Sequence, residues 1–134
     1  MIVRARAPLR LGLAGGGTDV SPYCDLHGGS VMNVTIDKYA YATIDASPDG
    51  LVHFLAQDAG AGERIAPGEA MAERTDAAGP LQLAKGVYRR IVAEHLGGRA
   101  PAIRVRTHSD APPGSGLGSS STMVVALVTA FAEY

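Results

Sequence analysis

A glycine-rich segment lies between a strand pattern and an apolar helix pattern near the end of the chain. Residues 112–122 read PPGSGLGSSST, with a glycine at positions 114, 116 and 118. The alternation of residues 103–110 predicts a strand before the segment, and the apolar run of residues 123–132 predicts a buried helix after it. A strand-to-helix junction collects free backbone N–H groups at the positive end of a helix dipole. The segment therefore predicts a phosphate-binding loop.

Three other glycine-rich motifs share part of this pattern, and each requires a residue that this chain does not have. A Walker loop needs a lysine where Gly118 precedes Ser119. A dinucleotide-binding fingerprint needs a third glycine at position 119 and an opening parallel βαβ unit. A nucleophile elbow needs a glycine on each side of a central serine. A structural turn whose serine caps the helix stays open as an alternative.

The rest of the chain predicts strands first and helices later. The expected strands are residues 2–13, with an edge position or bulge at Pro8, then residues 30–37, 39–46 and 51–58, the last completing an antiparallel ribbon. Residues 59–79 carry little pattern and predict a loop with one short helix. Apolar spacing predicts an amphipathic helix over residues 81–96, ended by Gly97 and Gly98. The order β, β, β, β, α, β, α indicates an α+β fold with a mixed sheet.

The composition is that of one ordinary globular domain. The chain has 134 residues, of which 46% are hydrophobic and 19% charged. Its formal charge of -1 gives no broad field for attracting nucleic acid or an anionic membrane, so neither partner is predicted. A single cysteine, Cys24, and the lack of a signal peptide predict a cytoplasmic location.

The apolar run of residues 123–132 is about half as long as the roughly 20 residues that a membrane span needs. The chain stops at Tyr134, with no Gly, Asn or Pro to close the predicted helix. We therefore expect residues 1–134 to form one domain that is truncated at its C-terminal end.

The segment PPGSGLGSSS resembles the second motif of the GHMP kinases, the superfamily of galactokinase, homoserine kinase, mevalonate kinase and phosphomevalonate kinase. The resemblance implies that the loop wraps the phosphates of ATP through backbone amides, and that Ser120 approaches a Mg²⁺ ion. The residues that it assigns to ATP binding are Pro113, Gly114, Ser115, Gly116, Leu117, Gly118, Ser119, Ser120 and Ser121. Serines of this group could also cap the helix that follows.

The segment APLRLGLAGGGTD, residues 7–19, resembles the first motif of the same family. The resemblance implies that Arg10 is catalytic and lies near the transferred phosphoryl group, where a fixed positive charge stabilises the transition state. It also implies that Gly17, Thr18 and Asp19 bind substrate, with the Asp19 carboxylate accepting hydrogen bonds from sugar hydroxyls. Taken alone, Arg10 could be a surface charge and Asp19 a turn residue or helix cap.

Galactokinase-like members carry Glu and His where this chain has Gly16 and Gly17. The glycines and the following GGSVMNVTIDKYAYATI resemble the D-glycero-D-manno-heptose 7-phosphate kinases and some fucokinase-like relatives. This resemblance implies phosphorylation by ATP of the anomeric hydroxyl of a heptose 7-phosphate, feeding capsule or lipopolysaccharide biosynthesis. A fucokinase-like or other GHMP small-molecule kinase, and a non-catalytic nucleotide- or sugar-binding module, stay open as alternatives.

The family resemblance also implies the architecture. The expected N-terminal GHMP kinase domain is of the ribosomal protein S5 domain 2-like type, with a mixed, mainly antiparallel sheet and helices. A C-terminal ferredoxin-like domain and the catalytic aspartate are expected beyond Tyr134, so we expect this polypeptide alone to lack turnover. The expected partners of the intact protein are a small sugar substrate and ATP, and homodimerisation stays open.

Overall fold

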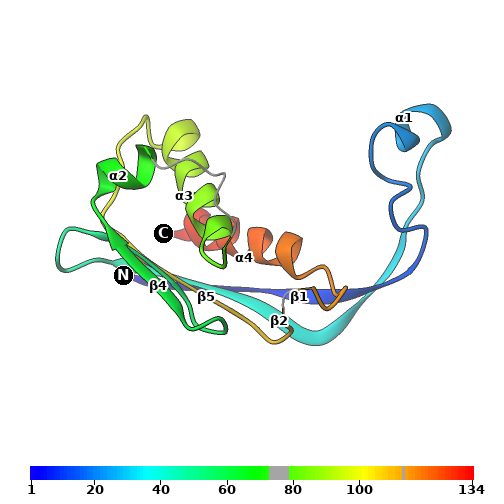
Figure 1. Ribbon diagram of the computed structural model, residues 1–134, viewed down its shortest axis with the longest axis horizontal. Coiled ribbons are helices and arrows are strands. Elements are labelled where there is room, and N and C mark those ends of the chain that lie inside the picture. Colours follow the sequence, from blue (N-terminus) through cyan, green and yellow to red (C-terminus); the bar gives the residue numbers. More distant parts are fainter. Residues whose placement is uncertain (73–78, 113) are drawn as a thin grey trace.

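The computed structural model describes residues 1–72, 79–112 and 114–134. Figure 1 shows the described part as one twisted sheet with α2, α3 and α4 on one of its faces. The elements in chain order are β1 (Ile2–Ala14), α1 (Tyr23–His27), β2 (Met32–Ala46), β3 (Val52–Ala56), β4 (Ala61–Ile65), α2 (Pro67–Ala72), α3 (Gln82–His95), β5 (Ile103–Ser109) and α4 (Ser119–Glu133). The predicted α+β class with a mixed sheet is confirmed.

The sheet order is β1-β2-β5-β3-β4, and β3 with β5 is the parallel pair among otherwise antiparallel neighbours. Pro8 lies on the edge strand β1, at a register shift between Pro8 and Arg10, as the sequence predicts. The predicted ribbon is wrong for residues 51–58, because β5 lies between β2 and β3. A hairpin prediction pairs strands that are neighbours in the chain, whereas β5, which comes later in the chain, takes the position between β2 and β3.

Two further differences concern strand boundaries. The two strands expected at residues 30–37 and 39–46 form one strand, β2, which pairs with β1 on both sides of the register shift that contains Lys38. The segment expected to be loop with one short helix contains α2 but also the strand β4, with the sequence AGERI. Its glycine, its charges and its partial burial hide the strand pattern, since an edge strand needs little apolar surface.

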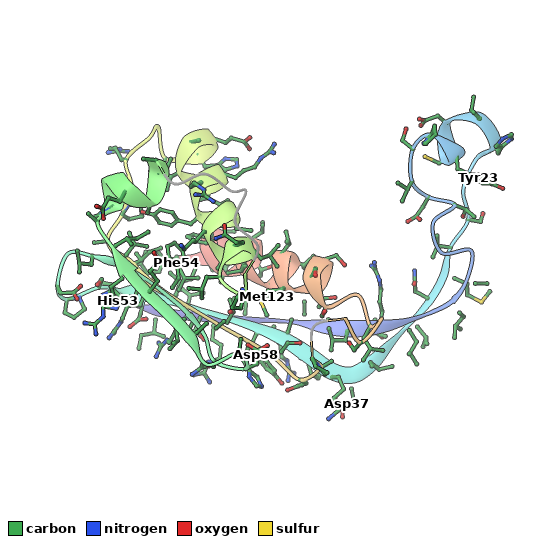
Figure 2. The ribbon with its side chains drawn as sticks, in the orientation of Figure 1. Tyr23, Asp37, His53, Phe54, Asp58 and Met123 are labelled. Carbon is green, nitrogen blue, oxygen red and sulfur yellow. The ribbon has the colours of Figure 1, made fainter. Side chains whose placement is uncertain are left out.

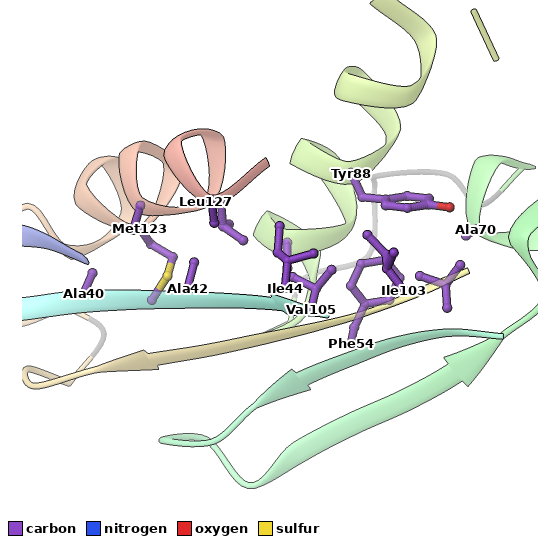
Figure 3. Close-up of a cluster of buried hydrophobic side chains, with 14 of the residues drawn as sticks. Ala40, Ala42, Ile44, Phe54, Ala70, Tyr88, Ile103, Val105, Met123 and Leu127 are labelled. Atoms are coloured by element: carbon purple, nitrogen blue, oxygen red, sulfur yellow. The ribbon is translucent and has the colours of Figure 1, made fainter. Parts of the chain in front are cut away.

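The core lies between the sheet and the helices α3 and α4 (Figure 3). Strand residues of alternate positions, including Ile44, Phe54 and Val105, are almost fully buried against Tyr88 of α3 and Leu127 of α4. The rings of Phe54 and Tyr88 meet edge to face, with centroids 5.6 Å apart. The Tyr88 hydroxyl donates a hydrogen bond to the Pro101 carbonyl at 2.9 Å. Burial raises the pKa of Tyr88 to about 12.

The helix α4 is only partly buried. Its inner face packs on β1 and β2, whereas Val125 and Val128 on its outer face are 56% and 43% exposed. Across the described ranges, no helix combines the length and the apolar character that crossing a lipid bilayer requires.

Residues 15–31 form the α1 excursion, which projects beyond the end of the helix layer (Figure 1). Figure 2 shows Tyr23 at the far end of this excursion, away from the core around Phe54 and Met123. Val20 and Leu26 are 59% and 75% exposed, so the excursion has no core of its own. Its shape is held at its neck, where the backbones of Gly15 and Gly29 closely approach those of Ser30 and Thr18.

Candidate functional site

The loop that precedes α4 has the backbone conformation that its glycines predict. Gly114, Gly116 and Gly118 have φ angles of 79°, 75° and 66°, in the left-handed region that favours glycine. A Cβ atom added at Gly114 or Gly116 would meet nothing within 4 Å, so the loop faces open space there. A hollow of about 350 Å³ is lined by Gly114, Gly116, Gly118, Ser119, Ser120 and Ser121. The site residue Pro113 lies outside the described residues.

The first turn of α4 points toward this hollow without a side-chain cap. The cap residue is Gly118, and no side chain of the described residues caps the first amides of the helix. The Ser121 hydroxyl instead donates to the Gly118 carbonyl at 3.1 Å. The alternative of a serine cap is therefore not found, because Gly118 takes the cap position in the left-handed conformation. Uncapped amides at a helix N-terminus remain available to an anion.

Arg10 lies against this loop. The Arg10 backbone N–H donates to the Leu117 carbonyl at 3.2 Å, and its Nη2 atom lies 3.5 Å from the Ser121 hydroxyl oxygen. A Cβ atom on Gly118 would be 3.1 Å from Arg10 Nε, so the guanidinium side chain packs across that glycine. The bulge after Pro8 allows Leu9 to be fully buried while Arg10 reaches the loop. The two motifs therefore meet in space, although Arg10 and Ser121 are 111 positions apart.

Thr18 closes the neck of the α1 excursion. Its hydroxyl oxygen lies 2.7 Å from the Gly15 carbonyl oxygen and 3.0 Å from the Ser30 carbonyl oxygen, and it accepts a hydrogen bond from the Ser30 N–H at 3.2 Å. Because the hydroxyl already has these partners, the first role of Thr18 is to fix the shape of the excursion. Gly17, with a φ of 86°, turns the chain beside it.

Asp19 is exposed on the same excursion, with no hydrogen bond or ion pair to any residue that the structure describes. Its neighbours along the chain extend away from α4 (Figure 1). The structure thus brings Arg10 to the glycine-rich loop, but it joins neither Asp19 nor Thr18 to that loop by a contact.

A second hollow adjoins the loop, and the sequence gives no sign of it. It holds about 200 Å³ and shares Ser119 and Ser120 with the loop. Its lining is mostly apolar and includes Ala56, Asp58, Pro80, Leu83, Thr107, Ala111 and Met123. The hollow forms where the carboxyl ends of the parallel pair β3 and β5 meet α3 and α4, a common ligand position in such sheets. The parallel pairing of β3 with β5 creates this hollow, and local sequence patterns do not predict that pairing.

The donors around the loop suit ATP with its bound Mg²⁺. Backbone amides and one guanidinium are acceptable partners for phosphate oxygens, and the exposed Ser120 hydroxyl is a hard oxygen ligand of the kind that Mg²⁺ prefers. Among the residues that the structure describes, no three side chains of His, Cys, Asp or Glu group together to hold a metal ion. A metal at this loop would therefore depend on the nucleotide phosphates for most of its ligands.

Comparison with known proteins places the loop in a recognised domain. Residues 82–134, which contain α3, β5, the loop and α4, match the GHMP kinases N terminal domain. The chain is 41% identical over 133 residues to a D-glycero-alpha-D-manno-heptose 7-phosphate kinase of Campylobacter jejuni, and this match covers 98% of the chain and 38% of that protein.

Solved structures agree with this comparison. A D-glycero-D-manno-heptose 1-phosphate kinase from Bacteroides thetaiotaomicron is 43% identical, with a TM-score of 0.82, over 99% of this chain and 42% of that one. A putative sugar kinase from Campylobacter jejuni is 38% identical, with a TM-score of 0.75, over 98% of this chain and 40% of that one. The chain thus spans about two fifths of the length of these relatives.

Proposed function

We propose, from the premise that this chain carries the N-terminal domain of the GHMP kinases, that the protein transfers the γ-phosphoryl group of ATP to a sugar hydroxyl. The observation that carries the proposal is the contact of Arg10 with the glycine-rich loop, since it combines a fixed cation and a set of open amides in one place. Relatives that are named as kinases are about 40% identical to this chain in sequence. Residues 1–134 would form the N-terminal domain of that enzyme.

In this proposal the loop residues hold the phosphates of ATP. The amides of residues 114–121 and the N-terminus of α4 bind the phosphate oxygens, and the glycines allow the backbone to approach them. Bound Mg²⁺ would neutralise part of the phosphate charge, with Ser120 as the hydroxyl that reaches it. The Arg10 guanidinium, held across Gly118, then stabilises the charge that develops on the transferred group.

The nucleotide base would occupy the second hollow. This hollow is mostly apolar, continuous with the loop through Ser119 and Ser120, and bordered by Leu83 and Met123. A base binds in such a pocket through burial of its faces, with a few polar groups fixing its orientation.

The acceptor would lie between the loop and the α1 excursion. Asp19 offers an unpaired carboxylate to hydroxyl groups, while Gly17 and Thr18 shape the backbone next to it. Because no contact joins Asp19 to the loop, an acceptor held by both Asp19 and Arg10 has to span the interval between them. A seven-carbon sugar phosphate, with hydroxyls along its length, meets this requirement better than a small alcohol.

The relatives differ in the phosphate position that their names give, one a heptose 7-phosphate and the other a heptose 1-phosphate. We favour the anomeric hydroxyl of a heptose 7-phosphate as the acceptor, in nucleotide-activated heptose synthesis in the cytoplasm. A fucokinase-like activity and a non-catalytic binding module are the alternatives that the test must separate.

The test is to incubate the full-length protein with Mg-ATP and a panel of heptose 7-phosphate, heptose, mannose and fucose derivatives. ADP formation is measured for each sugar, and ³¹P NMR of the product identifies the phosphorylated position. The expected result is turnover with the heptose 7-phosphate and a new anomeric phosphate. ADP formation with fucose alone would indicate a fucokinase-like enzyme, and ATP binding without turnover on any sugar would indicate a binding module.

A further inference from the structure

The face of the sheet opposite α2, α3 and α4 carries no helix in the described part of the chain (Figure 1). The strand register gathers cations on one half of this face. Arg104 of β5 is paired with Asp45 on β2 and with His53 on β3, and His53 is in turn paired with Arg64 on β4. Arg106 lies two positions further along β5, on the same face as Arg104.

A single carboxylate fixes two of these arginines. Asp45 is 3% exposed, and its two oxygens accept hydrogen bonds from Arg104 Nη2 and from Arg106 Nη2, the latter at 3.1 Å. Two guanidinium groups against one carboxylate leave an excess of one positive charge, to which the exposed Arg64 adds another. The Nε atoms of Arg104 and Arg106 have no hydrogen-bond partner among the described residues. These Nε atoms are themselves buried, but the Arg104 and Arg106 side chains are 41% and 34% exposed, so N–H groups that do not bind Asp45 remain open to a ligand.

These side chains line a hollow of about 440 Å³, together with His53, Leu55 and Gly62. Glu63 also borders the hollow, but its carboxylate is paired with Lys85 at 2.5 Å. His53 is held by Asp49, with its Nε2 atom 2.9 Å from a carboxylate oxygen. The remaining charge of the hollow is thus that of the three arginines, partly offset by Asp45.

We propose that this hollow binds a small phosphate-bearing metabolite, at a site on the opposite side of the sheet from the glycine-rich loop. A planar guanidinium whose orientation is fixed by a carboxylate presents its other N–H groups in a fork that matches the oxygens of a phosphate group. The volume is within the range of small-molecule sites.

The distribution of charge favours a compact anion over a long polyanion such as nucleic acid. On the other half of the same face, the Arg6 guanidinium lies over the Tyr39 ring, 4.6 Å from its centroid. His108 lies 3.6 Å from an Asp110 carboxylate oxygen. Arg4 and Arg6 keep their charge on this face, but β1 lies two strands away from β5, so the hollow is the place where three arginines converge.

The test is a calorimetric titration of the full-length protein with inorganic phosphate and with pyrophosphate. A saturating non-hydrolysable ATP analogue is present, so that the glycine-rich loop is already occupied. Arg64→Gln is the main variant because Arg64 is exposed on an edge strand and does not hold Asp45. Loss of one charge-assisted hydrogen bond should weaken phosphate binding by about tenfold.

Two further variants complete the experiment. Arg106→Lys keeps the charge beside Asp45 but removes the planar fork, and it should also weaken binding. Arg4→Gln makes the same change of charge on the same face at the edge strand β1, and it should leave phosphate affinity unchanged. Circular dichroism and thermal unfolding check that each variant is folded.

The proposal is overturned if neither phosphate nor pyrophosphate binds at millimolar concentration, or if Arg64→Gln leaves the affinity unchanged. It is also overturned if Arg4→Gln weakens binding as much as Arg64→Gln does, because the attraction would then be spread over the whole face, as for a polyanionic chain. Since Arg64 and the loop lie on different faces, these results do not depend on whether the protein is a sugar kinase.

Discussion

The two halves of the β1–β2 pair are separated by the register shift between Pro8 and Arg10, and they differ in what covers them. In the half next to the core, Ala7, Leu9, Ala42 and Ile44 are buried beneath α4. In the other half, apolar side chains such as Leu13 are exposed and lead into the α1 excursion. Arg10 lies where the two halves meet, beside the glycine-rich loop. Along these two strands, the buried residues that stabilise the fold therefore lie on one side of Arg10, and the exposed residues that lead to the α1 excursion lie on the other.

The largest expected effect is on stability and belongs to the covered half. Leu9→Ala removes a β1 side chain that is 0% exposed, so it should lower the free energy of unfolding by about 2–5 kcal/mol. Leu13→Ala, at a side chain that is 60% exposed, should change it by less than about 0.5 kcal/mol. Urea unfolding followed by circular dichroism measures both. Equal losses would show that the two halves form one packed unit.

The next effect is on catalysis and concerns Arg10, at the boundary between the two halves. Arg10→Ala should slow turnover by about two orders of magnitude or more, since a donor aimed at transition-state charge contributes roughly 3 kcal/mol. Arg6→Ala is the matched control, because Arg6 is on the same strand but lies over Tyr39 on the other face of the sheet. Steady-state kinetics with ATP and the accepted sugar give kcat for each. A similar decrease in both variants would mean that strand β1 tolerates neither change for structural reasons.

A smaller effect concerns the pH dependence of α3, which packs on the same core as the covered half. The pKa of Tyr88 is raised to about 12 by burial, so its stabilising contribution is complete below about pH 10 and is lost as the pH rises through 12. This contribution is about 2–3 kcal/mol. Tyr88→Phe should cost about 1 kcal/mol at neutral pH through the lost bond to Pro101, but it should flatten the alkaline loss of stability. Urea unfolding at pH 7, 10 and 12 tests this, and equal alkaline slopes would contradict it.

Most elements could be predicted from the sequence because their patterns are local. The alternation of β1 and β5, the apolar spacing of α3 and the strand-to-helix position of the glycine-rich loop all match the structure. The order of the sheet could not be predicted, since the pairing of β5 between β2 and β3 depends on contacts far apart in the chain. The strand β4 could not be predicted either, because a half-buried edge strand needs little apolar character.

The candidate site likewise has features that local motifs predict and features that depend on contacts far apart in the chain. The motifs indicate the glycines at positions 114, 116 and 118 and the arginine at position 10, and the structure brings them together. The apolar hollow beside Ser119 is formed by ends of strands and helices that no local pattern connects. The distance of the α1 excursion from α4 depends on how far β1 and β2 extend beyond the core, which the alternation alone does not determine.

The most direct test of the central claim is the affinity of the full-length protein for a non-hydrolysable ATP analogue when Gly116 is replaced. Gly116→Val and Gly50→Val impose the same backbone strain, since both glycines have a φ of 75° and open space around the added Cβ. We expect Gly116→Val to weaken binding by about a hundredfold or more, because its side chain would occupy the space of the phosphates, and Gly50→Val to leave the affinity unchanged. Unchanged affinity in Gly116→Val would show that the phosphates bind elsewhere.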